Sequence, residues 1–584
     1  MRLTDDQKSA TNHDGHLALV SCPGSGKTRT IVAKLFNCLD EVQNSTRLVA
    51  CITYTNAGVD EIRYRLSKNL GREEYENNFE IDTIHGFCFQ NIFRPFHARL
   101  EVFASGYKVL PPEDVIYQER VREIIRCHGL DSRSLDGFSL LQRNSCLPYS
   151  ISYPAARDFW EFLDSNAYVD FNGIIYYSSQ IIQNNPFVAS ALSSKYAWIL
   201  VDEFQDTSVF QVEILQRINQ YNRTRFFIVG DPEQSIMGFA GGRPDLMESF
   251  SKEIKARTDL SLTGNFRSSK NIVRLAEKLI QRTPKMHAIG EIVDYDQEPN
   301  WIVSDGYFEG ITNSFLPWVN DHSIKYGECA ILAPSIFQFF PIAPRLRAVG
   351  IPLIGPGARP YRRSNHLIAP LAEEVCSYIQ QKETRLINVI RRCVHELIMN
   401  TDGKMANRLD TFEGDICLIM IIQIVETLKR ESPNAIDFLR DFAKDVAVIL
   451  HQYDFISSST AELVTISGIE IGEDIQNHQR DPRYYAENFR IEDLGLFGNT
   501  SNSIRLLTLH KAKGREFDAV AIIGVEDGLI PYGNPRPNSA DEAEARRLYY
   551  VGITRARKLL MFITDRNSQR PPSRFLKELG LYVS

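Results

Sequence analysis

The feature that most constrains this chain is a glycine-rich segment between an apolar run and a helical pattern, LALVSCPGSGKTRTIVAKL at residues 17–35. The apolar run 17–20 predicts a short buried strand, and residues 21–26 predict a loop before a helix that begins at Lys27. Gly24 and Gly26 allow backbone N–H groups to point inward at phosphate oxygens. The segment therefore predicts a phosphate-binding loop in an α/β domain.

The polar side chains of this loop indicate what the phosphates belong to. Lys27 would reach the β and γ phosphates of a nucleotide, and the Thr28 hydroxyl would ligate Mg²⁺. The usual pattern begins with glycine, whereas this chain has Ser21 there. A Gly/Ser-rich turn that merely joins two elements is the alternative. The loop residues expected at the nucleotide are Ser21, Gly24, Ser25, Gly26, Lys27, Thr28 and Arg29.

Two further strand ends supply acidic and amide groups. Trp198 to Val201 is a buried-strand run followed by Asp202 and Glu203, and ligands bind at that end of strands in open α/β sheets. Asp202 would hold Mg²⁺ through water, and Glu203 would orient or deprotonate the attacking water. A solvated turn is the alternative for an acidic pair at a strand end. After the strand 226–229, Gln234 could sense the γ-phosphate.

Composition limits the possible classes of protein. A chain of 584 residues suggests two to four domains. A net charge of −7 excludes a histone-like or tail-driven nucleic-acid binder, although a local basic groove remains possible. The longest apolar run, 416–422, is far below the ~20 residues that span a bilayer, and no signal peptide is seen. We therefore expect a soluble cytoplasmic protein without a membrane partner.

The ten cysteines lie singly along the chain, without the spacing of zinc or redox motifs. They are expected to be buried small hydrophobic residues in a reducing compartment. Cys22 is the exception, because it lies in the phosphate loop near a helix N-terminus, a setting that lowers the pKa of a thiol. We expect its oxidation to block ATP binding.

Nine segments in order resemble the motifs of superfamily 1A DNA helicases, the UvrD/Rep/PcrA group. They are LTDDQKSA (3–10), SCPGSGKT (21–28), CITYTNAGVDEI (51–62), IDTIHGFC (81–88), VDEFQDT (201–207), VGDPEQSIMGFAGG (229–242), LTGNFRSSKNI (262–272), IRLLTLHKAKGREFDAV (504–520) and RRLYYVGITRARKLL (546–560). One compact branch of this family pairs with a separate nuclease in Gabija-type antiphage defence.

The resemblance implies an α/β fold: two RecA-like P-loop NTPase motor domains with mainly helical insertions, the subdomains 1A, 1B, 2A and 2B. We expect the first motor domain at 1–90 and 167–272, and the second at 273–370 and 501–584. The insertions would be 91–166 and 371–500. Apolar residues at intervals of three and four predict helices at 113–129, 371–379, 384–397, 416–429 and 434–453.

The resemblance also implies roles at the nucleotide. Gln7 matches the residue that reads adenine, Phe266 an aromatic that packs on the base, and Glu516 a carboxylate at the ribose. Arg267 and Arg555 match two arginines that reach the γ-phosphate from the second motor domain. Fixed guanidinium groups there stabilise the charge of the transition state. ATP and Mg²⁺ are the implied cofactors.

Base-stacking aromatics and phosphate contacts typically hold single-stranded nucleic acid. By resemblance, the residues expected at DNA are Tyr54, Thr55, Asn56, His85, Phe239, Thr508 and His510. Ala57, Met237 and Ala240 depart from the family pattern, each removing a possible contact. We therefore expect an altered grip on DNA, with the motor still active. The insertion 371–500 has no match to the segment that grips duplex DNA, so translocation is better supported than unwinding.

The leading hypothesis is an ATP-dependent translocase and 3′–5′ helicase acting on single-stranded DNA and DNA junctions. The pathway, DNA repair or antiphage defence, stays open. A second hypothesis is a motor or sensor subunit that regulates a separate nuclease, as in a Gabija-like complex. It is motivated by the divergent insertion 371–500 and by the lack of a recognisable partner-binding tail. A third is a clamp that binds ATP and DNA without turnover, against which Glu203, Arg267 and Arg555 argue. An RNA helicase is less consistent with the motif sequences, which resemble those of the DNA-directed branch.

Overall fold

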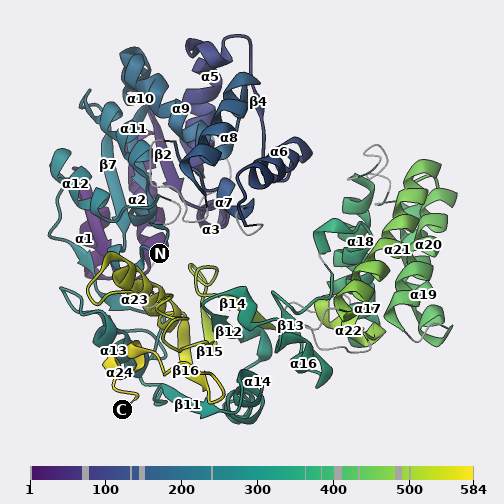
Figure 1. Ribbon diagram of the computed structural model, residues 1–584. Helices are drawn as coiled ribbons and strands as arrows, with labels where there is room; N and C mark the ends of the chain where they lie inside the picture. The colour runs from purple at the N-terminus through teal and green to yellow at the C-terminus, as the bar shows by residue number, and fades with distance from the viewer. Residues whose placement is uncertain are drawn as a thin grey trace. The chain divides into compact units, whose positions relative to one another are not determined.

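The computed structural model describes two compact units, Met1–Asp294 with Asn538–Tyr550, and Tyr295–Pro537 with Val551–Ser584 (Figure 1). The described residues are 3–68, 78–131, 135–143, 151–238, 241–361, 363–382, 385–399, 401, 409, 411–431, 434–480, 489–498, 502–533 and 535–582. Each unit is built around one six-stranded parallel sheet.

The sheet of the first unit has the strand order β3-β2-β6-β7-β1-β8, and all its pairs are parallel. The central strand β6 is buried along its whole length. Such a continuous apolar run is typical of a parallel strand that is covered on both faces. The strands are β1 (Leu17–Ser21), β2 (Leu48–Thr53), β3 (Phe79–Thr83), β6 (Tyr196–Val201), β7 (Arg225–Gly230) and β8 (Ser261–Leu262).

Helices cover both faces of this sheet. Trp198 and Leu200 of β6 pack into one core with Leu35, whereas Ile199 and Val201 pack into a second core with Leu215, as the alternation of a strand requires. The helices are α1 (Asp5–Thr11), α2 (Lys27–Val42), α3 (Asn56–Ser67), α4 (Ile84–Cys88), α9 (Phe171–Asn184), α10 (Pro186–Lys195), α11 (Val209–Asn219), α12 (Asp245–Glu253) and α13 (Lys270–Leu279).

A small helical subdomain interrupts the first unit. It contains α6 (Val115–Cys127), α7 (Leu135–Phe138) and α8 (Tyr153–Ser165), and it has its own core around Phe138 and Phe159. The helix expected at 113–129 is α6. A two-residue strand pair, β4 (Lys108–Val109) with β5 (Tyr168–Val169), joins the ends of this insertion.

The sheet of the second unit has the order β11-β16-β15-β12-β14-β13 and is also parallel. The chain leaves this sheet after β13 and returns at β14, more than one hundred residues later in the sequence. The strands are β11 (Asn300–Ser304), β12 (Cys329–Ala333), β13 (Leu353–Ile354), β14 (Ile504–Thr508), β15 (Phe517–Ile523) and β16 (Ala556–Asp565).

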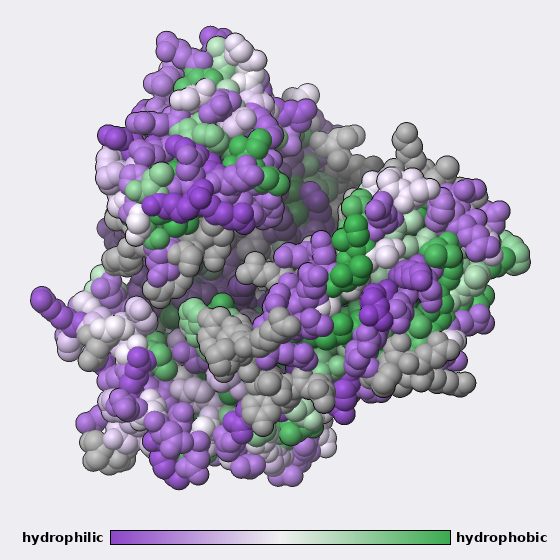
Figure 2. All heavy atoms as spheres, turned by 45° about the vertical axis from the view of Figure 1, so that its right-hand side comes forward, coloured by the Kyte–Doolittle hydropathy of each residue, from purple (hydrophilic) through white to green (hydrophobic). Residues whose placement is uncertain are grey.

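The excursion between β13 and β14 is helical, as predicted. Its helices are α17 (Ala369–Gln381), α18 (Arg385–Met399), α19 (Phe412–Glu431), α20 (Ala435–Gln452), α21 (Ser458–Arg480) and α22 (Ile491–Gly498). Apolar side chains also reach the surface of these helices, among them Phe412, Ile419, Val448 and Leu463 (Figure 2).

The α/β class with parallel sheets and helical insertions is confirmed. The two units differ from the expected motor domains, whose boundary was placed at 272/273. Residues 273–294 and 538–550 group with the first unit. The exact domain limits stay a prediction. Among the described residues, no helix is long and apolar enough to cross a membrane.

Close helix packing in the insertion leads to a stability prediction. A Cβ added at Gly468 of α21 would lie 2.4 Å from the Ala443 Cβ and 2.8 Å from the Leu439 carbonyl oxygen, both on α20. Gly468→Ala should therefore force the two helices apart and lower the free energy of unfolding by about 1–3 kcal/mol. Thermal unfolding followed by circular dichroism measures the change.

Gly472→Ala is the matched control on the same helix. A Cβ there would meet only the flexible Ile436 side chain, at 3.0 Å. This variant should be neutral or slightly more stable, because alanine favours helix over glycine. Equal melting temperatures for the two variants would contradict close packing at Gly468.

Candidate functional site

The predicted site residues of the first unit follow strands whose carboxyl ends lie at one edge of the sheet. Tyr54 follows β2, His85 lies in α4 after β3, Asp202 follows β6, and Gln234 lies in the short turn after β7. The phosphate loop follows β1, which lies next to β7. Parallel pairing therefore gathers five segments, far apart in the sequence, at one edge.

The phosphate loop has the backbone that its glycines predict. Gly24 and Gly26 have φ angles of +68° and +80°, and α2 begins directly afterwards at Lys27. Among the residues that the structure describes, no side chain caps the first turn of this 16-residue helix. Its backbone N–H groups are therefore available to an anion.

The loop residues also fit a nucleotide. The Ser25 hydroxyl is buried and has no hydrogen-bond partner among the described residues, a cost that a phosphate oxygen would remove. Thr28 is half-buried in the first turn of α2. This donor set, with carboxylates opposite, suits a triphosphate and the oxygen ligands that Mg²⁺ prefers.

Lys27 pairs with Glu203 across the site, with 3.0 Å between Nζ and Oε2. Burial lowers the pKa of Lys27, but Glu203 and two nearby aspartates outweigh burial and raise it overall. The lysine is therefore charged. Glu203 has φ 52° and ψ 42°, a left-handed conformation that costs a non-glycine residue about 1–3 kcal/mol. Such strain is typical of functional positions.

Asp202 is buried beside Glu203. Burial first, and the Glu203 charge second, raise the pKa of Asp202 above its ordinary value. Its Oδ1 accepts a hydrogen bond from the Glu203 backbone N–H at 2.9 Å. Two adjacent carboxylates at a buried strand end favour a bound cation, which would relieve their repulsion.

A chain of amide and carboxylate contacts continues from Glu203 to the next strand. Gln205 Nε2 donates to Glu203 Oε2 at 2.5 Å, and Gln205 Oε1 accepts from the Asp231 backbone N–H at 2.8 Å. The Asp231 carboxylate in turn accepts from Gln234 Nε2 at 2.6 Å. Gln205 thus joins the two strand ends. The sequence reading missed it, although it stands inside the segment VDEFQDT.

Gln7, Phe266 and Arg267 also contact the phosphate loop. Gln7 Nε2 donates to the Ser25 carbonyl oxygen at 3.0 Å, so Gln7 braces the loop. The Phe266 N–H donates to the Gly24 carbonyl oxygen at 2.9 Å, and the Arg29 guanidinium lies 6.0 Å from the Phe266 ring centroid.

The position of Arg267 corrects one expectation. A Cβ at Gly24 would lie 2.6 Å from the Arg267 Cβ, and Arg267 belongs to the first unit together with the loop. The reason is the backbone bond that ties its neighbour Phe266 to Gly24. Of the two arginines expected from the second motor domain, only Arg555 lies in the second unit.

The second unit carries the remaining candidates. Arg555 is buried, and it donates to the backbone oxygens of Val551 and Arg515 at 2.9 and 3.2 Å. Glu516 is exposed just before β15. Thr508 ends β14, and His510 follows it. Burial, with a smaller effect of Lys513, lowers the pKa of His510 to about 4, so its imidazole is neutral at pH 7.

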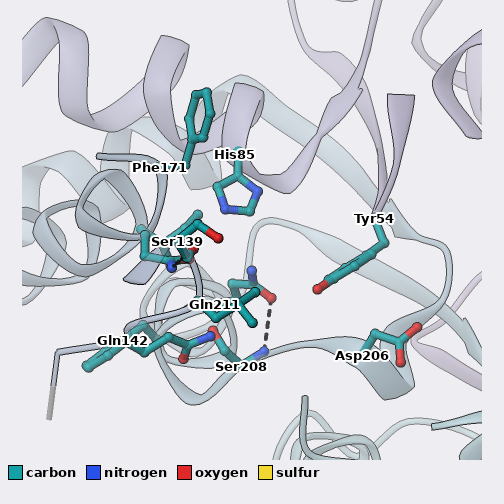
Figure 3. A pocket seen from close by; sticks show the side chains of 12 residues that line it. Tyr54, His85, Ser139, Gln142, Phe171, Asp206, Ser208 and Gln211 are labelled. Atoms are coloured by element: carbon teal, nitrogen blue, oxygen red, sulfur yellow. Dashed lines mark hydrogen bonds between the residues drawn. The ribbon is translucent and has the colours of Figure 1, made fainter. Parts of the chain in front are cut away.

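Two of the DNA candidates of the first unit, Tyr54 and His85, line a cavity of about 220 Å³ (Figure 3). Tyr54 and His85 point into it from the sheet edge, and His85 meets Phe171 edge-on at 6.5 Å between ring centroids. Burial lowers the pKa of His85. The other lining residues are Ser139, Leu140, Gln142, Asn172, Ile175, Asp206, Ser208, Phe210 and Gln211. Flat aromatic walls with amide groups suit a nucleobase.

The other DNA residues predicted in the first unit do not line this cavity in the described part of the structure. Thr55 caps α3 by accepting the Gly58 N–H at 3.1 Å, and Asn56 is exposed at the start of that helix. Phe239 lies outside the described residues, as does Ala240. Ser139, Gln142 and Phe171 were not predicted, because nothing in their local sequence distinguishes them from ordinary loop and helix residues.

One short segment reaches both sites. Glu203 pairs with Lys27 at the nucleotide side, and Asp206 lines the aromatic cavity three residues later. The three residues after Glu203 form a single turn of 3₁₀ helix, Phe204–Asp206. One continuous turn of backbone therefore joins the Lys27–Glu203 pair to the cavity.

Comparison with known proteins agrees with this arrangement. Residues 3–255 match the UvrD/REP helicase N-terminal domain, and residues 490–567 match the UvrD-like helicase C-terminal domain. The chain belongs to the UvrD/Rep/PcrA helicase family. The ATP-dependent DNA helicase PcrA of Staphylococcus epidermidis is 23% identical over 99% of this chain and 86% of its own length. PcrA of Staphylococcus aureus is 24% identical with the same coverage.

Cys22 departs from the expectation for a phosphate-loop cysteine. Burial raises the pKa of its thiol to about 12, whereas a helix N-terminus alone would lower it. The prediction of a reactive thiolate at Cys22 is therefore wrong. The side chain is 2% exposed and behaves as a core residue of this helicase-family fold.

This thiol pKa gives a chemical prediction. Iodoacetamide at pH 8 should alkylate the exposed Cys127 and leave Cys22 unmodified in the native protein, because only a thiolate attacks. Peptide mass spectrometry measures both sites, and unfolded protein in guanidinium chloride is the positive control for Cys22. Equal labelling of the two cysteines under native conditions would contradict the burial of Cys22.

Proposed function

We propose that this chain is an ATP-dependent translocase on single-stranded DNA and a 3′–5′ helicase. The single observation that carries the proposal is the segment 202–206, which joins the Lys27–Glu203 pair to the aromatic cavity of Tyr54 and His85. Family membership and the PcrA relatives support ATP and DNA as the ligands.

ATP binding would rearrange the Lys27–Glu203 pair. Lys27 leaves Glu203 for the β and γ phosphates, which frees the Glu203 carboxylate to accept a proton from the attacking water. Water then bonds to the γ-phosphorus, the bond to the β–γ bridging oxygen breaks, and ADP and phosphate leave. Bound Mg²⁺, held by Thr28 and through water by Asp202, would neutralise phosphate charge.

Sensing of the γ-phosphate is assigned to three side chains. Gln234 supplies a neutral amide from the first unit, and Arg267 lies against Gly24 of the phosphate loop. By family resemblance, Arg555 of the second unit completes the set. Because Arg555 belongs to the second unit, hydrolysis would require residues from both units.

DNA would be held by stacking on Tyr54 in the cavity, beside the neutral imidazole of His85. Burial first, and then Asp206, raise the pKa of the Tyr54 phenol to about 12, so it is protonated in the working range. Stacking tolerates any base sequence, as movement along DNA requires. Thr508 and His510 would contact the strand from the second unit.

Regulation of a separate nuclease in antiphage defence is the second candidate. Nothing in the described residues favours it over the first, and the ATP-dependent chemistry would be the same. Co-purification with the product of a neighbouring nuclease gene would support it. A non-cycling clamp differs by having no turnover, so an ATPase measurement separates it from both.

The catalytic pair can be tested by two substitutions. Lys27→Ala should reduce DNA-stimulated ATP hydrolysis by at least roughly 100-fold, because the β and γ phosphates lose their cation. Glu203→Gln should bind ATP with near-normal affinity and fail to turn it over. A coupled phosphate-release assay with single-stranded DNA measures both, and a Lys27→Ala protein of normal activity would refute the assignment.

The aromatic cavity gives a separate prediction. Tyr54→Ala should weaken binding of single-stranded DNA by about 1–3 kcal/mol, or roughly 5- to 150-fold, through lost stacking. Fluorescence anisotropy with a labelled oligonucleotide measures the affinity. Tyr64→Ala, which removes an exposed tyrosine from the nearby helix α3, is the matched control.

Polarity and unwinding need one further measurement. Strand displacement from duplexes with a 3′ or a 5′ single-stranded tail should proceed only with the 3′ tail. Displacement from the 5′-tailed duplex alone would contradict the proposed direction while leaving ATPase assignments intact.

A further inference from the structure

Arg282 is a buried arginine near the phosphate loop that no sequence motif indicates. Its side chain is 7% exposed, and its Nη1 lies 2.8 Å from Asp231 Oδ1, whose side chain is fully buried. Nη2 donates to the Ser21 carbonyl oxygen at 2.9 Å, where the phosphate loop begins. One guanidinium therefore joins the end of β7 to the end of β1.

The partner of Arg282 is the carboxylate that orients Gln234. Asp231 Oδ2 accepts from Gln234 Nε2, while Oδ1 accepts from Arg282. With both oxygens held, the carboxylate has a fixed plane, and the amide of Gln234 has a fixed direction. Without Arg282, Asp231 would be an uncompensated buried charge near Lys27, whose pKa it already raises.

Helix α23 (Ala540–Ile553) contacts Arg282 and the loop 231–235, which contains Asp231 and Gln234. Arg282 Nη1 lies 3.4 Å from the Tyr550 hydroxyl, and Arg547 Nε donates to the Ser235 carbonyl oxygen at 2.7 Å. The chain passes from the first to the second unit immediately after Tyr550, and Arg555 follows five residues later. The loop 231–235 is thus held from two sides, by Arg282 and by the helix that leads to Arg555.

We propose that Arg282 is a positioning residue for γ-phosphate sensing. It fixes the Asp231 carboxylate, and through it the Gln234 amide, relative to the phosphate loop and to α23. This proposal rests on the ATPase function proposed above. It assigns Arg282 to the rate of hydrolysis rather than to nucleotide affinity, because Arg282 contacts Asp231 and the backbone and leaves the phosphates to Lys27.

The competing explanation is a purely structural ion pair. Replacing a buried pair with neutral groups of similar size often preserves stability. The double substitution Arg282→Met with Asp231→Asn leaves the net charge unchanged and no buried charge unpaired. A structural pair would tolerate this change, whereas a positioning pair would lose the fixed plane that orients Gln234.

The experiment compares this double variant and Arg282→Lys with the wild type. We expect kcat for ATP hydrolysis on single-stranded DNA to fall at least tenfold in the double variant and about fivefold in Arg282→Lys. The Kd for a fluorescent ADP analogue should change less than threefold in both. Circular dichroism verifies folding, and if the double variant does not fold, Arg282→Lys carries the test.

The matched control is Arg257→Met with Asp259→Asn, an exposed arginine–aspartate pair of the same unit. It should leave kcat and Kd unchanged. A folded Arg282 variant with kcat within twofold of the wild type, or with lost ADP binding, would overturn the positioning role. Absence of DNA-stimulated turnover in the wild-type chain would instead overturn the proposed function, and this inference with it.

Discussion

The site depends on the parallel pairing of β6 between β2 and β7. This arrangement places the ends of three strands side by side, so that residues of the candidate nucleotide site and of the aromatic cavity share one sheet edge. Strand β6 matters most because the residues that follow it reach both sites. Glu203 contacts Lys27, and Asp206 lines the cavity of Tyr54. An antiparallel strand at this position would direct these side chains to the opposite edge.

Charged side chains at this sheet edge form ion pairs and hydrogen bonds that hold buried groups and a strained backbone in place. Lys27, Glu203, Asp231 and Arg282 lie largely out of water, and each is held by an ion pair or hydrogen bond. Isolated buried charges are costly, whereas connected ones fix a single geometry. The left-handed backbone of Glu203 is tolerated because the sheet, Gln205 and Lys27 all constrain it.

Local sequence patterns predicted an element correctly where the residues that determine its structure lie close together in the chain. The strand, loop and helix at 17–42 follow from adjacent residues. Helical periodicity located α6 and four helices of the second insertion, α17 to α20, but not α21 or α22. Cys22 was misjudged because burial, which depends on distant residues, outweighed the local helix terminus. Arg282 was missed for the same reason, since its partner Asp231 lies 51 positions away in the sequence.

The sequence by itself determined the fold class and the family, because those are encoded in short motifs whose order is fixed. Only the tertiary structure decided which groups meet. Lys27 and Glu203 are 176 positions apart, and their contact exists because β1 and β6 both pair with β7 in one parallel sheet. The surroundings of Cys22, the unit to which Arg267 belongs and the contacts of Arg282 depend on the tertiary structure, which short sequence motifs do not record.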